Sequence, residues 1–187
     1  MSDLKVNEVK TDTIKDQSGT TAMTIDTSGR ILTPARPSFF ARGYGSLRAQ
    51  GAATINGLTI SSTKQIVLWD SVDVNVGNHF NNTTGIFTVP IAGVYQVSYH
   101  LGKKAANGKY VQVTIYASSS DSTSVGYITQ YSGQDGSYGM YDTSGATCLV
   151  NASVGQQISL TLEQYNTNWT TPDTAQEYFS FGIYLIG

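Results

Sequence analysis

Alternation of apolar and polar residues with a period of two constrains the fold of this chain more than any other feature of its sequence. Three stretches show it clearly: residues 93–101, 110–117 and 157–163. Successive side chains of a β-strand point to opposite faces, so each stretch predicts a strand with one face in a core. Only 13% of the residues are charged, and glycine, serine, threonine and tyrosine are abundant. This composition favours an all-β domain with uncharged polar faces.

The expected strands can be placed along the chain from this alternation and from turn residues. Gly85 and the asparagine and threonine run at 81–84 mark one turn, and Pro90 ends the short strand that follows it. No stretch repeats with the period of a helix. We therefore expect about ten strands in a two-sheet jelly-roll sandwich, at residues 38–42, 54–60, 65–69, 86–89, 94–101, 110–117, 126–130, 146–150, 157–163 and 178–186.

The last expected strand, residues 178–186, is apolar on both faces. A core within one chain covers only one face of such a strand. The other face most simply contacts a neighbouring subunit, although a loop of the same chain is an alternative. In residues 110–117, two tyrosines on the polar face are too large to stand exposed without a partner. The candidate interface residues are Tyr110, Tyr116, Tyr178, Tyr184 and Ile186.

The N-terminal 36 residues carry a short repeat. Residues 13–19 and 24–29 each place an isoleucine before Asp-x-Ser-Gly, in which aspartate and serine cap a tight turn and glycine supplies a positive φ. The apolar residues are too sparse for a core in one copy, so we expect short strands that bury them against other copies, or else a disordered linker. Pro34 and Pro37 stiffen the connection. They predict a boundary between an arm, residues 1–36, and a head, residues 37–187.

Eight positions of the head match a known spacing: Trp69, Asn75, Phe80, Phe87, Gly93, Tyr95, Val97 and Tyr99. This pattern resembles the signature of the complement C1q-like domain, a relative of the tumour necrosis factor fold, with Trp69 and Val97 where that family has phenylalanine. The stretches PSFFA at 37–41 and YFSFGIYLI at 178–186 resemble its opening and closing strands. The resemblance implies a C1q/TNF-like jelly-roll that packs as a homotrimer about a three-fold axis, so the interface candidates become trimer-interface candidates.

Two phrases of the arm, IKDQSGTTAMTID and SGRILTPARP, resemble the leaders of virion structural proteins of tailed phages, particularly those of marine cyanobacteria. That resemblance implies a virion protein whose arm docks on other virion proteins. One cysteine forms no intrachain disulfide, and neither a secretory signal nor a membrane-spanning run is recognisable, which fits assembly in the host cytoplasm without membrane insertion. From Ala49 onward four basic and eight acidic residues give a net charge of −4, which argues against nucleic acid as a partner.

No group of residues matches a known catalytic motif. His79 and His100 have no partner carboxylate within a motif, and Cys148 lies in an apolar predicted strand, where a thiol is inert. No spacing among the acidic residues favours a glycosidase pair; they include Asp121, Asp135, Asp142, Glu163 and Glu177. We therefore expect no enzymatic activity, no cofactor and no metal site. The one ion that the aspartates would suit is Ca²⁺.

Residues 118–145 hold four of the twelve tyrosines and no lysine or arginine. Tyrosine offers a large amphipathic contact at low entropic cost, and serine and glycine let the backbone adapt, as in antibody paratopes. Tyrosine rings can stack on sugar faces while carboxylates accept hydroxyl protons, which predicts a glycan or protein receptor. The alternative is that some of these tyrosines belong to the core or to an interface strand. The candidate receptor-binding residues are Tyr127, Tyr131, Asp135, Tyr138 and Tyr141.

These observations predict a non-enzymatic phage virion structural protein with a trimeric, fibre-type head that projects from the particle and binds a host-surface receptor. The tyrosine-rich segment favours receptor binding, because three copies give avidity even to a weak site. The short arm favours an alternative, a trimeric capsid decoration or cement protein. A second alternative, a depolymerase of host polysaccharide, is disfavoured because no catalytic motif is present.

Overall fold

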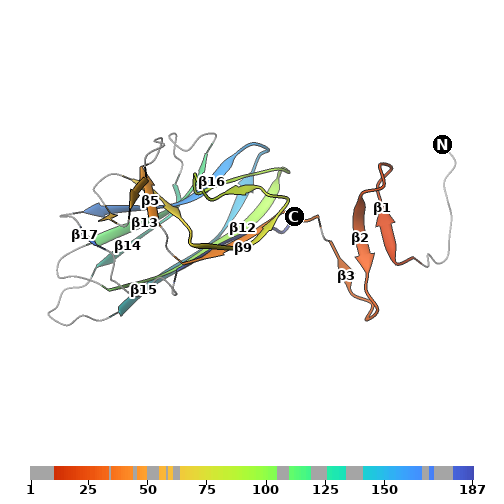
Figure 1. Cartoon of the computed structure of the whole chain (residues 1–187), viewed down its shortest axis with the longest axis horizontal. Coiled ribbons are helices and arrows are strands. Elements are labelled where there is room, and N and C mark those ends of the chain that lie inside the picture. The colour runs from red at the N-terminus through yellow and green to blue at the C-terminus, as the bar shows by residue number, and fades with distance from the viewer. Residues whose placement is uncertain are drawn as a thin grey trace. The chain divides into compact units, whose positions relative to one another are not determined.

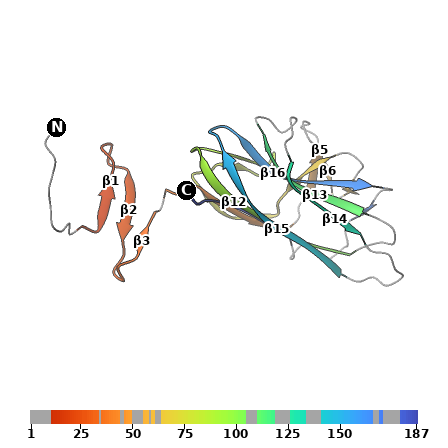
Figure 2. The same ribbon diagram turned by 180° about the vertical axis from the view of Figure 1, so that it is seen from behind.

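The structure is a computed structural model that describes residues 11–33, 35–43, 46–49, 55–57, 59–60, 64–104, 110–118, 126–133, 141–165, 169–170 and 179–187. Every regular element in these residues is a β-strand (Figures 1 and 2), so the expected all-β fold class is confirmed. The described residues accordingly form no helix that could cross a bilayer. The chain divides into two compact units, Met1–Arg36 and Pro37–Gly187, here called the arm and the head.

The arm is a three-stranded antiparallel meander of β1 (Thr13–Lys15), β2 (Thr21–Ile25) and β3 (Ile31–Leu32). Figure 1 draws these strands in red and orange, with β2 in the middle. Gly19 and Gly29, in the turns after β1 and β2, have φ angles of 89° and 77°. The positive φ expected of the two repeat glycines is therefore confirmed.

One layer of the head is a five-stranded sheet in the order β15-β12-β18-β4-β9. All its neighbouring pairs are antiparallel. Its longest pair, β12 with β15, stays in register from Gly93↔Ala152 to Lys104↔Tyr141. The strands are β4 (Ser38–Arg42), β9 (Ser71–Val76), β12 (Gly93–Lys104), β15 (Tyr141–Ala152) and β18 (Ser180–Leu185).

The second layer is an eight-stranded sheet, and β12 and β15 face β13 and β16 across the sandwich in both views (Figures 1 and 2). In this sheet β16 pairs with β13, β11 and β8. Its strands are β5 (Ser46–Ala49), β6 (Ile55–Gly57), β8 (Gln65–Leu68), β10 (Phe80–Asn81), β11 (Ile86–Thr88), β13 (Tyr110–Ser118), β14 (Gly126–Gly133) and β16 (Gln157–Tyr165). A further small pair joins β7 (Thr59–Ile60) to β17 (Trp169–Thr170).

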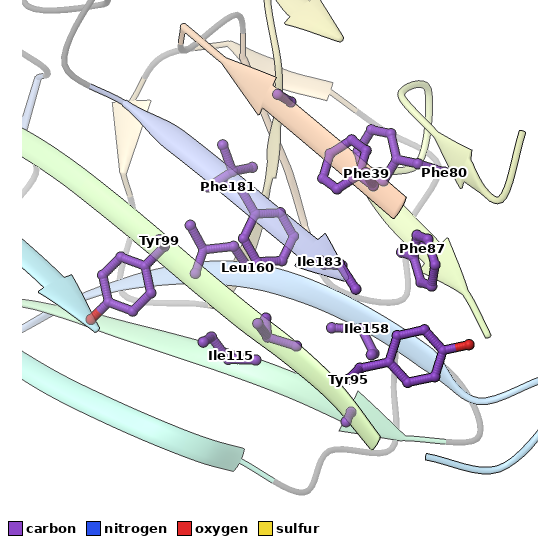
Figure 3. Close-up of a cluster of buried hydrophobic side chains, with 14 of the residues drawn as sticks. Phe39, Phe80, Phe87, Tyr95, Tyr99, Ile115, Ile158, Leu160, Phe181 and Ile183 are labelled. Carbon is purple, nitrogen blue, oxygen red and sulfur yellow. The ribbon is translucent and has the colours of Figure 1, made fainter. Parts of the chain in front are cut away.

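The core of the head contains a cluster of aromatic rings. Phe39 of β4 stacks on Phe80 with ring centroids 3.9 Å apart, and Phe87 and Phe181 contact the same ring at 6.4 and 5.7 Å (Figure 3). The eight-stranded sheet contributes aliphatic side chains, namely Val113, Ile115, Ala117, Ile158, Leu160 and Leu162. The predicted alternation in β13 and β16 thus places one face of each strand in the core.

The residues of the family signature build this core and its turns. The large apolar ones, Trp69, Phe80, Phe87, Tyr95, Val97 and Tyr99, are at most 5% exposed. Asn75 Nδ2 donates to the Phe80 carbonyl at 2.9 Å, and its Oδ1 accepts from the Phe80 N–H at 3.0 Å, which closes the turn between β9 and β10. A Cβ on Gly93 would lie 2.5 Å from the carbonyl oxygen of Gly187. The signature therefore specifies the fold rather than a ligand site.

Each expected strand of the head overlaps a strand of the structure. The predicted bounds Ser38–Arg42 are those of β4 in the structure. In contrast, β12 and β15 extend beyond the predicted residues, because they pair with each other over 12 residues. Four short strands, β5, β9, β10 and β17, are additional to the prediction. Of these, β9 forms one edge of the five-stranded sheet.

Candidate functional site

The face of the five-stranded sheet that points away from the core, here called the outward face, carries its side chains in ordered rows. Residues paired across antiparallel strands project to the same side of a sheet. One row contains Leu149, Gln96, Tyr184, Ser38 and Val76. The next contains Thr147, Ser98, Gly182, Phe40 and Val74. A third contains Gly145, His100, Ser180 and Arg42.

Large apolar side chains on the outward face are exposed in a single chain. Leu149, Tyr184 and Val74 are 60%, 37% and 36% exposed, and Ile186, directly after β18, is 43% exposed. Exposed apolar residues that gather on one sheet indicate a surface made for contact, whereas scattered ones do not. On the opposite side of β18, Phe181 is fully buried. The prediction that this strand has two apolar faces, of which its own chain buries one, is confirmed.

The other end of the outward face is polar. Arg42 Nε donates to Asp73 Oδ2 at 2.6 Å, and Ser71 Oγ donates to Asp73 Oδ1 at 2.6 Å. The hydrogen bond from Ser71, followed by the bond and charge of Arg42, lowers the pKa of Asp73 below its ordinary 3.8. The row that contains Arg42 also contains His100, which is exposed. The outward face therefore changes from apolar to charged along the direction of its strands. A partner with a matching change would fit this face in only one orientation.

Gly182 allows two rings to lie close to the sheet. A Cβ at this position would be 3.0 Å from Tyr184 Cε2 and 3.5 Å from Phe40 Cδ2. Both rings therefore reach the space above β18 that a larger residue would fill. Both rings thus belong to the middle of the outward face.

The trimer-interface candidates fall on two different sheets. Tyr184 and Ile186 lie on the outward face, but Tyr110 and Tyr116 lie in β13 of the eight-stranded sheet. Tyr116 needs no neighbouring subunit to cover it, because this residue is 5% exposed within a single chain and Lys64 Nζ lies 5.1 Å from its ring centroid. Its own chain already covers it. Tyr178 lies outside the described residues.

The receptor-binding candidates are placed only by their backbone. Tyr131 lies in β14 and pairs with Gln112 of β13, and Tyr127 lies in the same strand. Tyr141 is the first residue of β15. Asp135 and Tyr138 lie outside the described residues. Residues 118–145 thus contain β14 and the beginning of β15, while their role in binding stays a prediction.

His79 packs against a ring of the core, and Cys148 is half-buried in β15. The His79 ring packs edge-on against Phe87, with centroids 6.2 Å apart. Burial raises the pKa of the Cys148 thiol, which keeps it protonated and unreactive at neutral pH.

The described residues also contain no group of three histidine, cysteine or acidic side chains that could hold a metal ion. Glu163 lies in β16 and Asp142 in β15, whereas Asp121, Asp135 and Glu177 lie outside the described residues. The suggestion of Ca²⁺ therefore stays a prediction.

The sequence prediction omits several residues of the outward face, among them the apolar Phe40, Val74 and Leu149. A signal exists for two of them. Leu149 lies between Cys148 and Val150, and such an apolar run indicates a strand that is apolar on both faces. Val74 lies between Asp73 and Asn75, which is the alternation of a half-buried strand.

Residues 51–186 of the chain match the family model of the C1q domain. The chain belongs to the C1q-domain family. Among solved structures, this C1q domain is similar to the globular domain of zebrafish complement 1qA protein, with a TM-score of 0.52 and 13% identity over 81% of this chain and 98% of that one.

The C1q domain is also similar to murine APRIL, solved at pH 8.0, with a TM-score of 0.54 and 9% identity over 80% of this chain and 99% of that one. At such low identities the two structures show the fold alone. The C1q- and TNF-like jelly-roll fold expected from the spacing at residues 69–99 is confirmed.

Proposed function

We propose that this C1q-domain protein forms a homotrimer through the outward face of its five-stranded sheet. The observation that carries the proposal is the gathering of exposed apolar side chains, Leu149, Tyr184 and Ile186, on that one face. Burial of apolar surface contributes roughly 25 cal/mol per Å², so covering this face stabilises an assembly. The C1q-like family packs as homotrimers about a three-fold axis, which favours three copies over two.

Two substitutions test the assembly. Tyr184→Glu and Ile186→Asp place a charge on the outward face but leave the buried side of β18 unchanged, so we expect folded monomers. Thr88→Glu is the matched control, because Thr88 is exposed on the eight-stranded sheet; it should remain trimeric. Light scattering gives the mass, and circular dichroism checks the fold. Trimers from both outward-face variants would refute the proposal.

We propose further that the trimer is a non-enzymatic structural protein of a phage particle, with a fibre-type head that binds a host-surface glycan or protein. Two phrases of the arm, IKDQSGTTAMTID and SGRILTPARP, support a place in a phage particle, since they resemble leaders of phage virion proteins. The tyrosines of residues 118–145 support binding to a host-surface receptor. Three copies in one trimer give avidity, so each site can be weak. The arm would attach to other virion proteins, and the acidic head makes nucleic acid an unfavourable partner.

The location of the protein on purified particles tests this role. Gold-labelled antibody against the head should mark a projecting fibre, and the isolated trimer should bind host cells. Tyr131→Ala and Tyr138→Ala should abolish this binding while Thr88→Glu retains it. A trimer that host cells ignore, in spite of a position on fibres, would contradict receptor binding.

The alternative of a capsid decoration protein makes a different prediction for the same experiment. The short arm favours it, because docking on a shell needs little reach. In that case the antibody labels the capsid surface, and empty capsids bind the trimer while host cells do not. Release of reducing sugar from host envelopes would instead support the depolymerase.

A further inference from the structure

The arm consists of two strand-and-turn units whose turns have the same pattern of hydrogen bonds. In the first turn the Asp16 N–H donates to the Thr20 carbonyl at 2.9 Å, and Asp16 Oδ1 accepts from the Thr20 N–H at 2.8 Å. In the second, the Asp26 N–H donates to the Arg30 carbonyl at 3.0 Å, and Asp26 Oδ1 accepts from the Arg30 N–H at 2.9 Å. The repeat in the sequence is therefore a repeat in the structure.

The register of this meander sorts its side chains onto two unlike faces. Residues paired across the strands share a face, and so do residues two apart in β2. The first face, here called the isoleucine face, carries Ile14, Met23, Ile25 and Ile31. The second carries Thr13, Thr24 and Leu32. The four residues of the isoleucine face are therefore apolar, and all three strands contribute to them. The register shifts next to them, between Ile14 and Lys15, where Lys15 pairs with Thr21.

No second layer covers the isoleucine face within the described part of the arm. Ile14, Ile25 and Ile31 are 45%, 38% and 64% exposed. A small sheet with an apolar face needs a packing partner, because sheets are stable as one of two packed layers. The isoleucine face of the described arm therefore needs a packing partner.

We propose that the isoleucine face of each arm is buried against the isoleucine faces of two further copies of this chain. The inference rests on the trimer proposed for the head. Charge is consistent with a like partner: the four residues of the isoleucine face are uncharged, and the Asp26 and Arg30 side chains are engaged with each other at 2.6 Å in their own turn. These four residues therefore offer no charge with which a partner of opposite charge could pair.

Chain connectivity supports the same occupant. The arm continues into β4 at Ser38, which lies in the row of Tyr184 on the outward face. Only residues 33–37 separate Leu32 from Ser38, a span of roughly 20 Å when extended. In a trimer that closes through the outward face, three arms begin close to one another. Tethering of this kind raises the local concentration to about millimolar, so a weak contact between arms is sufficient.

Cross-linking of the full-length chain tests the proposal. In a Cys148→Ala background, Ile25→Cys places the only thiol on the isoleucine face, and Thr24→Cys places it on the other face of the same strand. With a three-armed maleimide reagent we expect covalent trimers from Ile25→Cys at no less than about tenfold the rate for Thr24→Cys. The tenfold margin separates defined contact from the chance collisions that tethering also promotes.

A second pair of variants checks the packing without a cross-linker. Ile31→Asp and Leu32→Asp place a charge on adjacent exposed residues of β3 that lie on opposite faces. Trypsin should cleave after Lys15 about tenfold faster in Ile31→Asp, because the charge separates the arms, a change that corresponds to 1.4 kcal/mol of protection. Leu32→Asp should change the rate less than twofold.

The outcomes separate this inference from the proposed function. If light scattering shows trimers but Ile25→Cys and Thr24→Cys cross-link equally, the arm inference is refuted and the head trimer stands. If the arm of the isolated trimer is protected from trypsin only after other particle proteins are added, the face belongs to such a protein and the inference is equally refuted. A monomeric wild-type chain would refute the trimer itself.

Discussion

At the scale of single residues, Asn75 shows how a signature position stabilises the head. Its side chain makes two hydrogen bonds to the backbone of Phe80, whose ring stacks in the core. Asn75→Ala removes both bonds and leaves the half-buried Phe80 backbone groups unpaired, so we expect the free energy of unfolding to fall by about 2 kcal/mol. Asn151→Ala, at an exposed position of β15, should change it by less than about 0.5 kcal/mol. Denaturant titration measures both, and equal values would contradict the role of Asn75.

Gly93 lies where the C-terminal residues leave no space for a side chain. An added Cβ would lie 2.5 Å from the Gly187 carbonyl oxygen and 2.9 Å from Leu185 Cδ1. Gly93→Ala should therefore destabilise the head by about 1–3 kcal/mol, because the C-terminal residues must move. In a chain that ends at Ile186 the same substitution should cost less. A double-mutant cycle measures this coupling, and additive effects would show that Gly187 is not the obstacle.

At the scale of elements, the sequence predicts strands well where alternation is long and poorly where a strand depends on its partner. Residues 110–117 and 157–163 alternate strongly, and both are strands of the head. In contrast, β10 has two residues, and it is a strand only because Phe80 and Asn81 pair with β11. Alternation also shows that Tyr116 points away from the core, but it cannot show which segment covers that side.

The two turns of the arm are elements whose stability should depend on pH. Bonds from Ser18 and Thr20 lower the pKa of Asp16, and bonds from Arg30 lower that of Asp26. A carboxyl group whose pKa is lower in the folded than in the unfolded chain stabilises the fold. This contribution is complete above the ordinary pKa of the group, and it is lost as the pH falls through the lowered pKa of the folded state. We therefore expect the meander to loosen in acid, below the ordinary value of 3.8.

Nuclear magnetic resonance can measure this loss. Cross-strand contacts between Thr13 and Thr24 should weaken as the two carboxyl groups take up protons. The variant with both Asp16→Asn and Asp26→Asn is the control, since an amide oxygen still accepts the turn bonds but does not titrate. Carboxyl carbons with midpoints at or above 3.8 would contradict the prediction.

At the scale of the whole molecule, the order of strands decides which predicted surfaces can act together. The sequence indicates that the closing strand has two apolar faces, but only the sheet order places it beside β12 and β4 and so joins Leu149, Tyr184 and Val74 on one face. The same order separates this face from Tyr110 and Tyr116. Strand order results from long-range pairing, and a period of two within each strand carries no information about it.

Arm and head should contribute separately to the stability of the trimer. Arm and head each have an exposed apolar face, but the head also has its own core, so residues 37–187 should fold and form trimers without the arm. If the arms associate as proposed, their loss removes a tethered contact, and the concentration at which trimers dissociate should rise by about tenfold or more. Sedimentation over a dilution series measures this concentration for the full chain and for residues 37–187. An unchanged value would show that the arms add nothing to the trimer. A head that stays monomeric at every concentration would show that the outward face does not hold the trimer together without the arm.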